Sequence, residues 1–521
     1  MTEGGDLVGA GAGAEYSGDL AQARQFFQGR IGQSSDFRYR NIRLGPKGPA
    51  AMLVYLEGMI DGTAVDEQIL QPAMQNGPAL VQDLPNAART LEQSLTSRAA
   101  VRRTSDLRKA ERGVLDAQTC LIVDGCPELL LLGVQKFPQR AIEKPSTEHS
   151  VRGSREAFTE VLMTNLTLVR RRVKDPNLRV KALQVGSRSQ TWVAVCYIEK
   201  LTNPAVVEEV LRRLKRIRID GLQGVQTLEE FLVDHPSTPF PLLRSTERPD
   251  EVARQLLSGK VVILADNSPF SLSAPSVLLD FYQTMDDYHF GFWGASMIRL
   301  VRFIGWLLTL YLPAVYIALI AVNPEMLPHK LALTVAAARE GLPFPPIMEV
   351  LVIEVLLELI REAALRLPQP LGTTIGVVGG IVVGEAIVSA GLISPLMIIF
   401  AATTMLASFT SPTLDVNFAW RLMKWLLIAL AQVFGLMGII VGSVVLFGHL
   451  AALTSFGVPY LAPVAPLTKE DLGDTIVRLP YWALRFRPRH LRPLDRRRAA
   501  AYDHPVQTPD LEGAQREGEE R

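Results

Sequence analysis

The chain has few of the residues that metal centres, disulfide frameworks and redox sites require. Its 521 residues include only three cysteines and seven histidines. No two cysteines form a Cys-x-x-Cys pair and no histidine cluster accompanies them, which argues against a zinc or redox site. Cys120, Cys126 and Cys196 are therefore expected to be buried, reduced thiols, and neither a metal nor a cofactor is expected.

The fingerprints of nucleotide-binding and hydrolytic sites are missing as well. The sequence has no Gly-x-x-x-x-Gly-Lys-Ser/Thr loop, no Gly-x-Gly-x-x-Gly after a strand, no His-Glu-x-x-His and no Gly-x-Ser-x-Gly. Aromatic residues make up 7% of the chain and do not alternate with basic ones, so nucleic acid is not an expected partner. These absences predict that the chain is not an enzyme, although a soluble half that acts on a small ligand stays open as a rival hypothesis.

The net charge of +1 gives no guide to partners, but the charges are distributed unevenly along the chain. The chain is polar up to about Gly291, apolar from Val301 to Leu453, and polar again from Lys469. Residues 1–30 lack a basic segment followed by an apolar run, so they do not resemble a signal peptide and are expected to be disordered. The polar amino-terminal half is therefore expected to stay in the cytoplasm.

Several apolar stretches have the length of about 20 residues that a membrane-spanning helix needs. The candidates are Val301–Val322, Pro345–Pro368, Leu371–Gly391, Leu392–Thr410 and Trp425–Leu453. The segment His329–Phe344 is too short and too charged to cross, and is expected to form an interfacial or re-entrant helix. The chain is predicted to be a polytopic α-helical protein in contact with membrane lipid.

Basic residues favour the cytoplasmic side of a membrane. They occur at Arg170–Arg172 in the soluble half, at Arg421 and Lys424 before the last apolar stretch, and at Arg485–Arg498 in the tail. Five spans cannot place both ends of the chain on one side. Either one segment is therefore re-entrant, or the last apolar stretch folds as a hairpin, with a bend in the range Gly435–Gly442.

One carboxylate stands inside a glycine-rich apolar segment. Gly376, Gly380 and Gly384 recur every four residues, so on a helix they share one face, a pattern that lets helices approach closely in lipid. Glu385 lies about 100° round the helix from Gly384. Because a lone carboxylate in hydrocarbon is costly, Glu385 is expected to face a partner group, water or a subunit seam. A structural role stays open beside a functional one.

A second helix carries an acidic row. Glu354, Glu358 and Glu362 recur at intervals of four, and Arg361 joins their face, where it can pair with Glu358. The row either lines a cation route or forms a structural seam neutralised by arginines of the same helix, unless the helix lies flat at the interface. The candidate pore or seam residues are Glu385, Gly376, Gly380, Gly384, Thr373, Glu354, Glu358, Arg361 and Glu362.

The soluble half contains a repeat. The segment Val54–Leu70 resembles Cys196–Leu211 when Tyr55 is aligned with Tyr197, and the same spacing of 142 aligns CLIVDGCP with VILADNSP. A constant spacing over about 70 residues indicates a duplicated unit. Alternating strands and helices predict two α/β subdomains with mixed sheets covered by helices, followed by the polytopic helical domain.

Acidic and basic residues of the repeat have two interpretations each. Glu57, Glu199, Asp124 and Asp266 fall at equivalent strand ends, where they either bind a ligand or form turns. The basic segment LVRRRVKD is expected to be a solvated helix face or a membrane-facing patch.

Five ordered motifs resemble the A subunits of spore germinant receptors, the GerA family. They are VRGSREAFTEVLMTNLTLVRRRVKDPNL, STPFPLLRSTERPD, AAAREGLPFP, REAALRLPQPLG and SFGVPYLAPVAP. The resemblance covers roughly Asp36 to Arg498, and the AAAREGLPFP form resembles receptor subunits more than the stage V sporulation paralogue. Lys200 stands where relatives often have Gly, and Glu385 stands where many have Gln. The resemblance therefore implies a polar residue at position 385 but does not require a charge there.

The resemblance implies a multi-pass protein of the spore inner membrane with a cytoplasmic amino-terminal domain. It implies a transporter-like B subunit and a lipoprotein C subunit as partners, homo-oligomer formation, and a cation-conducting role with Leu371–Gly391 as the pore helix. The rivals are a non-conducting scaffold that clusters receptor subunits and an amplifying stage V sporulation paralogue. The predicted domains are a disordered segment 1–30, subdomains 31–150 and 151–295, a transmembrane domain 296–460 and a basic, partly disordered tail 461–521.

Overall fold

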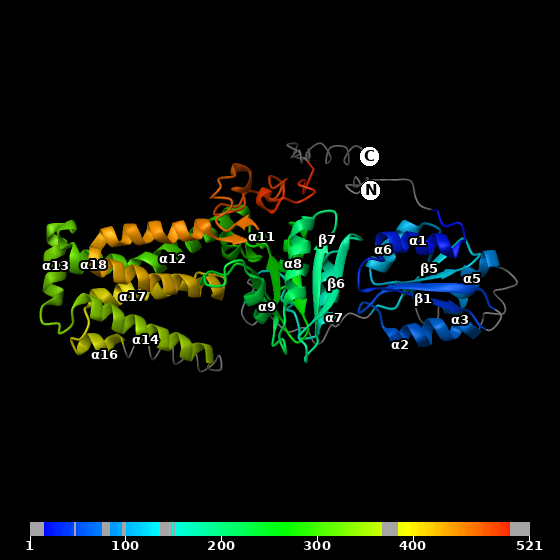
Figure 1. The fold of residues 1–521 in the computed structure, drawn as a ribbon, viewed down its shortest axis with the longest axis horizontal. Helices are drawn as coiled ribbons and strands as arrows, with labels where there is room; N and C mark the ends of the chain where they lie inside the picture. The colour runs from blue at the N-terminus through cyan, green and yellow to red at the C-terminus, as the bar shows by residue number, and fades with distance from the viewer. Residues whose placement is uncertain are drawn as a thin grey trace, which may run out of the picture.

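The computed structural model describes residues 15–45, 48–75, 84–95, 100–135, 145, 148, 152–366 and 384–500. Three parts follow one another along the long axis: an α/β unit at the right of Figure 1, a second at the centre, and a helical domain at the left. We call them subdomain 1, subdomain 2 and the helical domain. This order confirms the predicted fold class, while the predicted domain limits stay predictions.

Subdomain 1 is built on a five-stranded antiparallel sheet with helices on both faces. Met52 and Val54 face α1 and α6, whereas Ala51 and Leu53 face η1, α3 and α5, because successive side chains of a strand point to opposite faces. The strand order is β1-β2-β4-β5-β3. The elements are α1 (Leu20–Arg30), β1 (Phe37–Arg43), β2 (Ala50–Leu56), α2 (Gly62–Ala64), η1 (Val65–Leu70), α3 (Gln71–Gln75), η2 (Leu84–Asn86), α5 (Ala87–Leu95), β3 (Ala100–Thr104), α6 (Leu107–Leu115), β4 (Thr119–Val123) and β5 (Leu129–Gly133).

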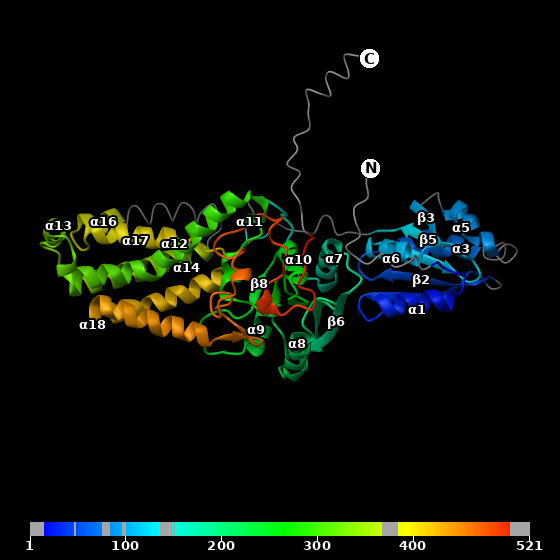
Figure 2. The same cartoon turned by 90° about the horizontal axis from the view of Figure 1, so that it is seen from above.

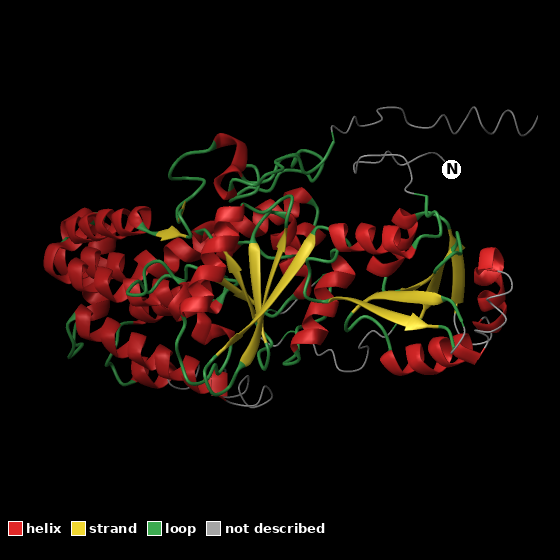
Figure 3. Ribbon diagram, turned by 45° about the vertical axis from the view of Figure 1, so that its right-hand side comes forward, coloured by secondary structure: helices red, strands yellow, loops and turns green. Residues whose placement is uncertain are grey.

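Subdomain 2 repeats this plan with the order β6-β7-β9-β10-β8. Helices α7 and α10 pack on one face of its sheet, and α8 and α9 pack on the other. Figure 3 shows the two sheets as separate units. The elements are α7 (Leu162–Arg172), β6 (Leu178–Val185), β7 (Thr191–Ile198), α8 (Pro204–Arg216), α9 (Val225–Leu232), β8 (Arg244–Thr246), α10 (Pro249–Leu257), β9 (Val261–Ala265), β10 (Ser271–Ala274), η3 (Leu278–Tyr282) and α11 (Asp286–His289).

The two subdomains match element by element at the spacing of 142 residues read from the sequence. Helices α1 and α7 begin 142 residues apart, and so do strands β4 and β9. Asp61 and Asn203 both cap the helix that follows β2 or β7 by accepting backbone N–H groups. The outer strand slips by one residue, since Phe37 pairs with Leu56 whereas Leu178 pairs with Ile198.

The prediction of mixed sheets is wrong, because every strand pair among the described residues is antiparallel. Short turns join β4 to β5 and β6 to β7, and only antiparallel neighbours can be joined by a short turn. The helical segments between β2 and β3 and between β3 and β4 then carry the chain to the far edge and back to the centre. Alternation of strands and helices therefore did not require parallel strands here.

A buried ion pair joins the two subdomains. Arg170 of α7 and Asp36, which precedes β1, are each about 2–3% exposed, and Arg170 Nε lies 2.7 Å from Asp36 Oδ2. Ser34 accepts from Arg170 at 2.8 Å, and Ser35 N donates to the Val180 carbonyl at 2.8 Å. The pair corrects the expectation that LVRRRVKD is solvated, since its first arginine is buried in the joint and the next two are bound to Glu156.

The helical domain contains two helical runs that are long and apolar enough to cross a membrane, Phe292–Val322 and Leu414–Ala452, within the described residues. The other helices are shorter or carry more charges. The elements are α12 (Phe292–Ile317), η4 (Ala318–Val322), η5 (Pro324–Met326), α13 (His329–Arg339), α14 (Pro346–Arg366), α16 (Gly384–Ser389), α17 (Pro395–Ser408) and α18 (Leu414–Ala452).

Helix α18 turns back on itself at Gly435. This residue has φ 60° and ψ −139°, inside a helix of 39 residues. A Cβ placed on Gly442 would lie 2.6 Å from Leu427 Cδ2, so residues on the two sides of the bend are in contact. Both ends of α18 reach subdomain 2: Thr413 Oγ1 donates to the Phe281 carbonyl before the helix begins, and Ser455 Oγ donates to the Leu242 carbonyl after it ends. Figures 1 and 2 show the two arms diverging from the far end of the domain. The hairpin is one of the two solutions that the sequence left open.

After α18 the chain forms a small hairpin, β11 (Thr454–Ser455) and β12 (Val458–Pro459), and then runs back over subdomain 2. Within this tail, η7 (Lys469–Asp471) and η8 (Arg489–Leu491) are short helical turns. Leu494 N donates to the Leu201 carbonyl at 2.9 Å, and Arg487 Nε to the Leu257 carbonyl at 2.8 Å. The described part of the tail is therefore held against subdomain 2.

Candidate functional site

The core of the helical domain contains a buried ion pair between α14 and α18. Glu354 and Lys424 are each about 3% exposed, and Lys424 Nζ donates to Glu354 Oε2. Apolar side chains of α12, α14, α17 and α18 form the surrounding core. Because an ionised group among apolar helices is costly without a partner, each charge requires the other.

A second set of charges lies one turn further along α14. Glu358 is paired with Arg361 of its own helix at 2.7 Å and with Arg421 of α18. Arg361 Nη2 also donates to Ser408 Oγ at the end of α17, at 3.4 Å. We call the two pairings, Glu354–Lys424 and Glu358 with Arg361 and Arg421, the ionic ladder. It ties three helices together.

The ladder follows from helical spacing. Residues four apart on α14 and three apart on α18 lie on one face of their helices, so Glu354 and Glu358 meet Lys424 and Arg421 in register. Glu362 continues the acidic row toward the end of α14, where its side chain is exposed. The predicted pairing of Glu358 with Arg361 is confirmed.

Some polar atoms of the ionic ladder make no hydrogen bond within the described part of the chain. Glu354 Oε1, Arg361 Nε and Arg421 Nε are buried without a hydrogen-bond partner among the described residues. Buried polar atoms are ordinarily bonded to protein or to ordered water. These atoms therefore provide acceptor and donor positions for water or an ion within the apolar domain.

A separate polar cluster occupies the end of the helical domain that faces away from subdomain 2. Glu349 of α14 is fully buried, lies 2.9 Å from Arg339 Nη2 of α13, and accepts from Ser394 N at 3.2 Å. Tyr316 of α12 lies 3.1 Å from Ser394 Oγ. The cluster fixes the short helix α13, predicted as interfacial or re-entrant, to the ends of α12, α14 and α17.

The structure does not bring all the predicted pore residues together. Glu385 lies exposed on α16, which Figures 1 and 2 place near α13 at the far end of the domain. Gly384 begins the same short helix. Thr373, Gly376 and Gly380 lie outside the described residues. Their relation to the ladder and to Glu385 stays a prediction.

Arg421 and Lys424 have a role in the ionic ladder that the sequence did not predict. Their expected preference for the cytoplasmic side stays a prediction; in the structure Lys424 is buried and both residues are bound to α14 carboxylates. Neutralisation by an arginine of the same helix is found for Glu358 with Arg361, and Arg421 and Lys424 of α18 bind Glu358 and Glu354 in addition. Two basic residues at a spacing of three inside an apolar stretch were the signal that could have found them.

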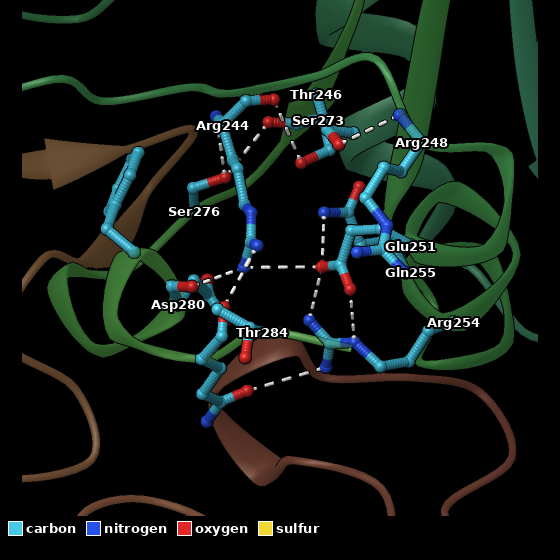
Figure 4. A network of polar contacts seen from close by, with 12 residues as sticks. Arg244, Thr246, Arg248, Glu251, Arg254, Gln255, Ser273, Ser276, Asp280 and Thr284 are labelled. Carbon is cyan, nitrogen blue, oxygen red and sulfur yellow. Dashed lines mark hydrogen bonds and ion pairs between the residues drawn. The ribbon is translucent and has the colours of Figure 1, made fainter. Parts of the chain in front are cut away.

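A polar network joins subdomain 2 to the helical domain. Glu251 of α10 lies between Arg244, at 3.2 Å, and Arg254, at 2.6 Å, as Figure 4 shows. The two guanidinium groups outweigh the effect of burial and hold the pKa of Glu251 at about 2. Arg244 also donates to the carbonyls of Asp280 and Gln283, which lie just before α11.

The network continues into the first turns of α12. Asp287 is fully buried and accepts from Arg299 Nε at 2.9 Å and Arg302 Nη1 at 2.8 Å. Arg299 Nη1 also lies 2.9 Å from Asp474 of the tail. Arg478 Nη1 donates to the Asp287 carbonyl at 2.6 Å. Subdomain 2, α12 and the tail are thus connected through charged groups.

Three of the four acids at the strand ends of the repeat have side-chain partners within the protein. Glu57 pairs with Arg38 at 2.7 Å, and Glu199 pairs with Arg179 at 2.6 Å. Asp266 accepts from Leu162 N at 3.0 Å, at the start of α7. These contacts favour the structural interpretation over ligand binding. The three cysteines are free and buried, as predicted.

Comparison with known proteins places these features in a family. Residues 25–490 match the profile of the Bacillus/Clostridium GerA spore germination protein family. Spore germination protein KA of Bacillus subtilis (strain 168) is 36% identical over 459 residues, 88% of this chain and 84% of that protein. The uncharacterized membrane protein YfkQ of the same strain is 36% identical over 454 residues, 87% of this chain and 88% of that protein.

A solved structure is similar to the amino-terminal half. It is the crystal structure of the N-terminal domain of the A subunit of the Bacillus megaterium spore germinant receptor GerK3, with 30% identity and a TM-score of 0.41. The match covers 51% of this chain and 99% of that domain. The family profile confirms the resemblance seen in the five motifs and the prediction that the chain is not an enzyme. The chain belongs to the GerA family of spore germination proteins.

Proposed function

We propose that this membrane protein is the A subunit of a nutrient germinant receptor in the spore inner membrane, where it couples nutrient sensing to ion release. Its partners are a transporter-like B subunit and a lipoprotein C subunit. The soluble subdomains and the tail lie in the cytoplasm, and copies of the helical domain assemble into a cation conduit. The family match supports the receptor role, and the helical domain supports the conduit.

The single observation that carries the conduit is the ionic ladder. Charged side chains within the membrane-embedded part of a helix cost free energy, so they usually mark ion paths or contacts between helices. Glu354 Oε1 and the two arginine Nε atoms give the ladder unused acceptor and donor positions among the described residues. The exposed carboxylate of Glu385 needs water, an ion or a neighbouring subunit beside it.

The arrangement of the helical domain supports the cytoplasmic placement of both ends. The hairpin in α18 returns the chain to subdomain 2, so the tail emerges on the side from which α12 departs. Arginines of the tail then lie on the same side as subdomain 2, in agreement with the preference of basic residues for the cytoplasm.

The test is potassium release from spores after nutrient addition, with the chain present, absent or altered. Release is expected to vanish in spores that lack the chain. With Gly380→Leu, Gly384→Leu or Glu385→Leu, the receptor is expected to assemble in normal amount while the rate of release changes. Gly448→Leu, at a helical glycine with open space around it, is the matched control.

The outcomes distinguish the rivals. Loss of release without the chain but normal release from all three variants would support a scaffold that carries no ions. Slowed release in spores lacking the chain would instead favour an amplifying stage V sporulation paralogue. Normal release without the chain would contradict a required receptor role.

A further inference from the structure

The first turns of α12 and the adjoining tail expose a row of large apolar and aromatic side chains. Trp293 is 78% exposed, and Met297, one turn further along the same face of the helix, is 64% exposed. In the tail, Tyr481 is 55% exposed, with more exposed apolar side chains on either side of it. We call this surface the aromatic ledge; its tail members are Val477, Leu479, Tyr481, Trp482 and Phe486.

The two halves of the ledge are fixed to each other. Ser296 Oγ, within the first turns of α12, accepts from Arg478 N at 3.1 Å and donates to the Arg478 carbonyl at 3.1 Å. The rings of Tyr288 and Tyr481 meet edge to face with centroids 6.5 Å apart. The tail therefore cannot shift along α12 without breaking these contacts.

The length of the helix sets the depth of the ledge. The continuous run Phe292–Val322 has 31 residues, which is about 46 Å at about 1.5 Å per residue. A bilayer has a hydrocarbon core of about 30 Å, and about 40–45 Å including the headgroups. Because Arg299 and Arg302 occupy the beginning of this run and pair there with Asp287 of α11, its first turns lie among the headgroups and not in the hydrocarbon.

The charge of the tail complements an anionic membrane surface. Arg498 lies with its guanidinium 5.2 Å from the centre of the Tyr481 ring and donates to Tyr481 Oη at 3.1 Å. Arg497 pairs through its backbone with Phe486 and is exposed. Aromatic rings with a polar atom prefer the headgroup layer, and each basic residue near it attracts anionic lipid.

We propose that the aromatic ledge lies in the headgroup layer of the leaflet that faces subdomain 2 and binds anionic phospholipid headgroups. The tail thereby becomes a membrane-interface element and not a free cytoplasmic extension. Since Asp474 and Arg478 tie it to α12 and α11, lipid bound at the ledge acts on the junction between subdomain 2 and the helical domain.

The test uses the full chain reconstituted in vesicles. Its three native cysteines are buried, so a single new cysteine can be labelled with an environment-sensitive fluorophore. Tyr481→Cys and Trp293→Cys report on the two halves of the ledge, and Trp192→Cys, at a 48% exposed residue of β7, is the control. Vesicles are made of phosphatidylcholine alone or of phosphatidylcholine mixed with phosphatidylglycerol.

The ledge labels are expected to shift to shorter emission wavelength and to be quenched by headgroup-level spin-labelled lipid, more strongly with phosphatidylglycerol. The control label stays in water. With Arg497→Gln and Arg498→Gln, the ratio of shielded to exposed label in anionic vesicles should fall about fivefold per arginine. Arg188→Gln, at an exposed arginine of subdomain 2, should leave it unchanged.

Three outcomes would overturn the proposal. Both ledge labels could stay in water in both kinds of vesicle. They could be shielded equally with and without phosphatidylglycerol, and that result would exclude anionic headgroups as the specific ligand. They could become shielded only when a partner subunit is added, which makes the ledge a protein interface. The two independent label positions keep the test valid if one variant fails to fold.

Discussion

At the scale of single residues, the ionic ladder makes an asymmetric prediction about stability. Lys424→Met leaves Glu354 buried without its counter-charge, and breaking a buried pair in this way costs about 3–5 kcal/mol. The double variant Lys424→Met/Glu354→Leu removes both charges and should recover most of that loss. The measurement is thermal unfolding of the detergent-solubilised full chain. If the single variant were as stable as the double, Glu354 would have another partner in solution.

The same residues show where sequence reasoning stops. The acidic row on α14 was visible as a spacing of four, and the pairing of Glu358 with Arg361 followed from that helix alone. Lys424 lies 70 positions from Glu354, and no local pattern couples them. Its role depends on how α18 packs against α14, which is a tertiary property.

At the scale of elements, the bend in α18 depends on a single glycine. Gly435 has φ 60°, a conformation that costs other residues about 1–3 kcal/mol, and an added Cβ would lie 1.9 Å from Asn323 Oδ1. Gly435→Ala should therefore lower the thermal midpoint of the full chain and displace Asn323 from Leu436 N, to which it is bonded. Gly448→Ala, at a helical glycine with nothing within 4 Å, is the control and should leave the midpoint unchanged.

Elements were predictable where a local signal existed. The spacing of 142 residues located the second subdomain, and the helices that Asp61 and Asn203 cap begin at this spacing. The glycines of the last apolar stretch indicated a bend but not its position. The predicted direction of the strands was wrong. Strand order and direction depend on pairing between segments distant in the sequence, as between β2 and β4.

At the scale of the whole molecule, the arrangement of the three parts rests on polar joints. Asp36 and Arg170 connect subdomain 1 to subdomain 2, and Asp287 with Arg299 connects subdomain 2 to α12. Both joints are buried and charged, so each is strong only while both of its charges are present. A signal that passes from the soluble subdomains to the helices has to cross these contacts.

The first joint leads to a prediction with a defined pH dependence. Burial alone would raise the pKa of Asp36, but the charge and hydrogen bonds of Arg170, with Ser34, lower it below the ordinary value of 3.8. A carboxyl group whose pKa is lower in the folded state stabilises the protein above its ordinary pKa. This contribution is lost as the pH falls through the folded value. Asp36→Asn should therefore lower the stability of the joint at pH 7 and make it less sensitive to acid.

Hydrogen exchange of the full chain in detergent measures this effect. Amides of α7 and β6, which line the joint, should exchange faster in Asp36→Asn than in the unaltered chain at pH 7, and the difference should shrink as the pH falls below 3.8, the ordinary pKa of this carboxyl group. Asp220→Asn is the matched control, since its pair with Arg188 is exposed and should contribute almost nothing. Equal exchange in both variants would mean that other contacts, such as the hydrogen bonds from Ser35 N to the Val180 carbonyl and from Arg179 to the Arg30 carbonyl, hold the subdomains together, and that the buried pair does not fix their relative position.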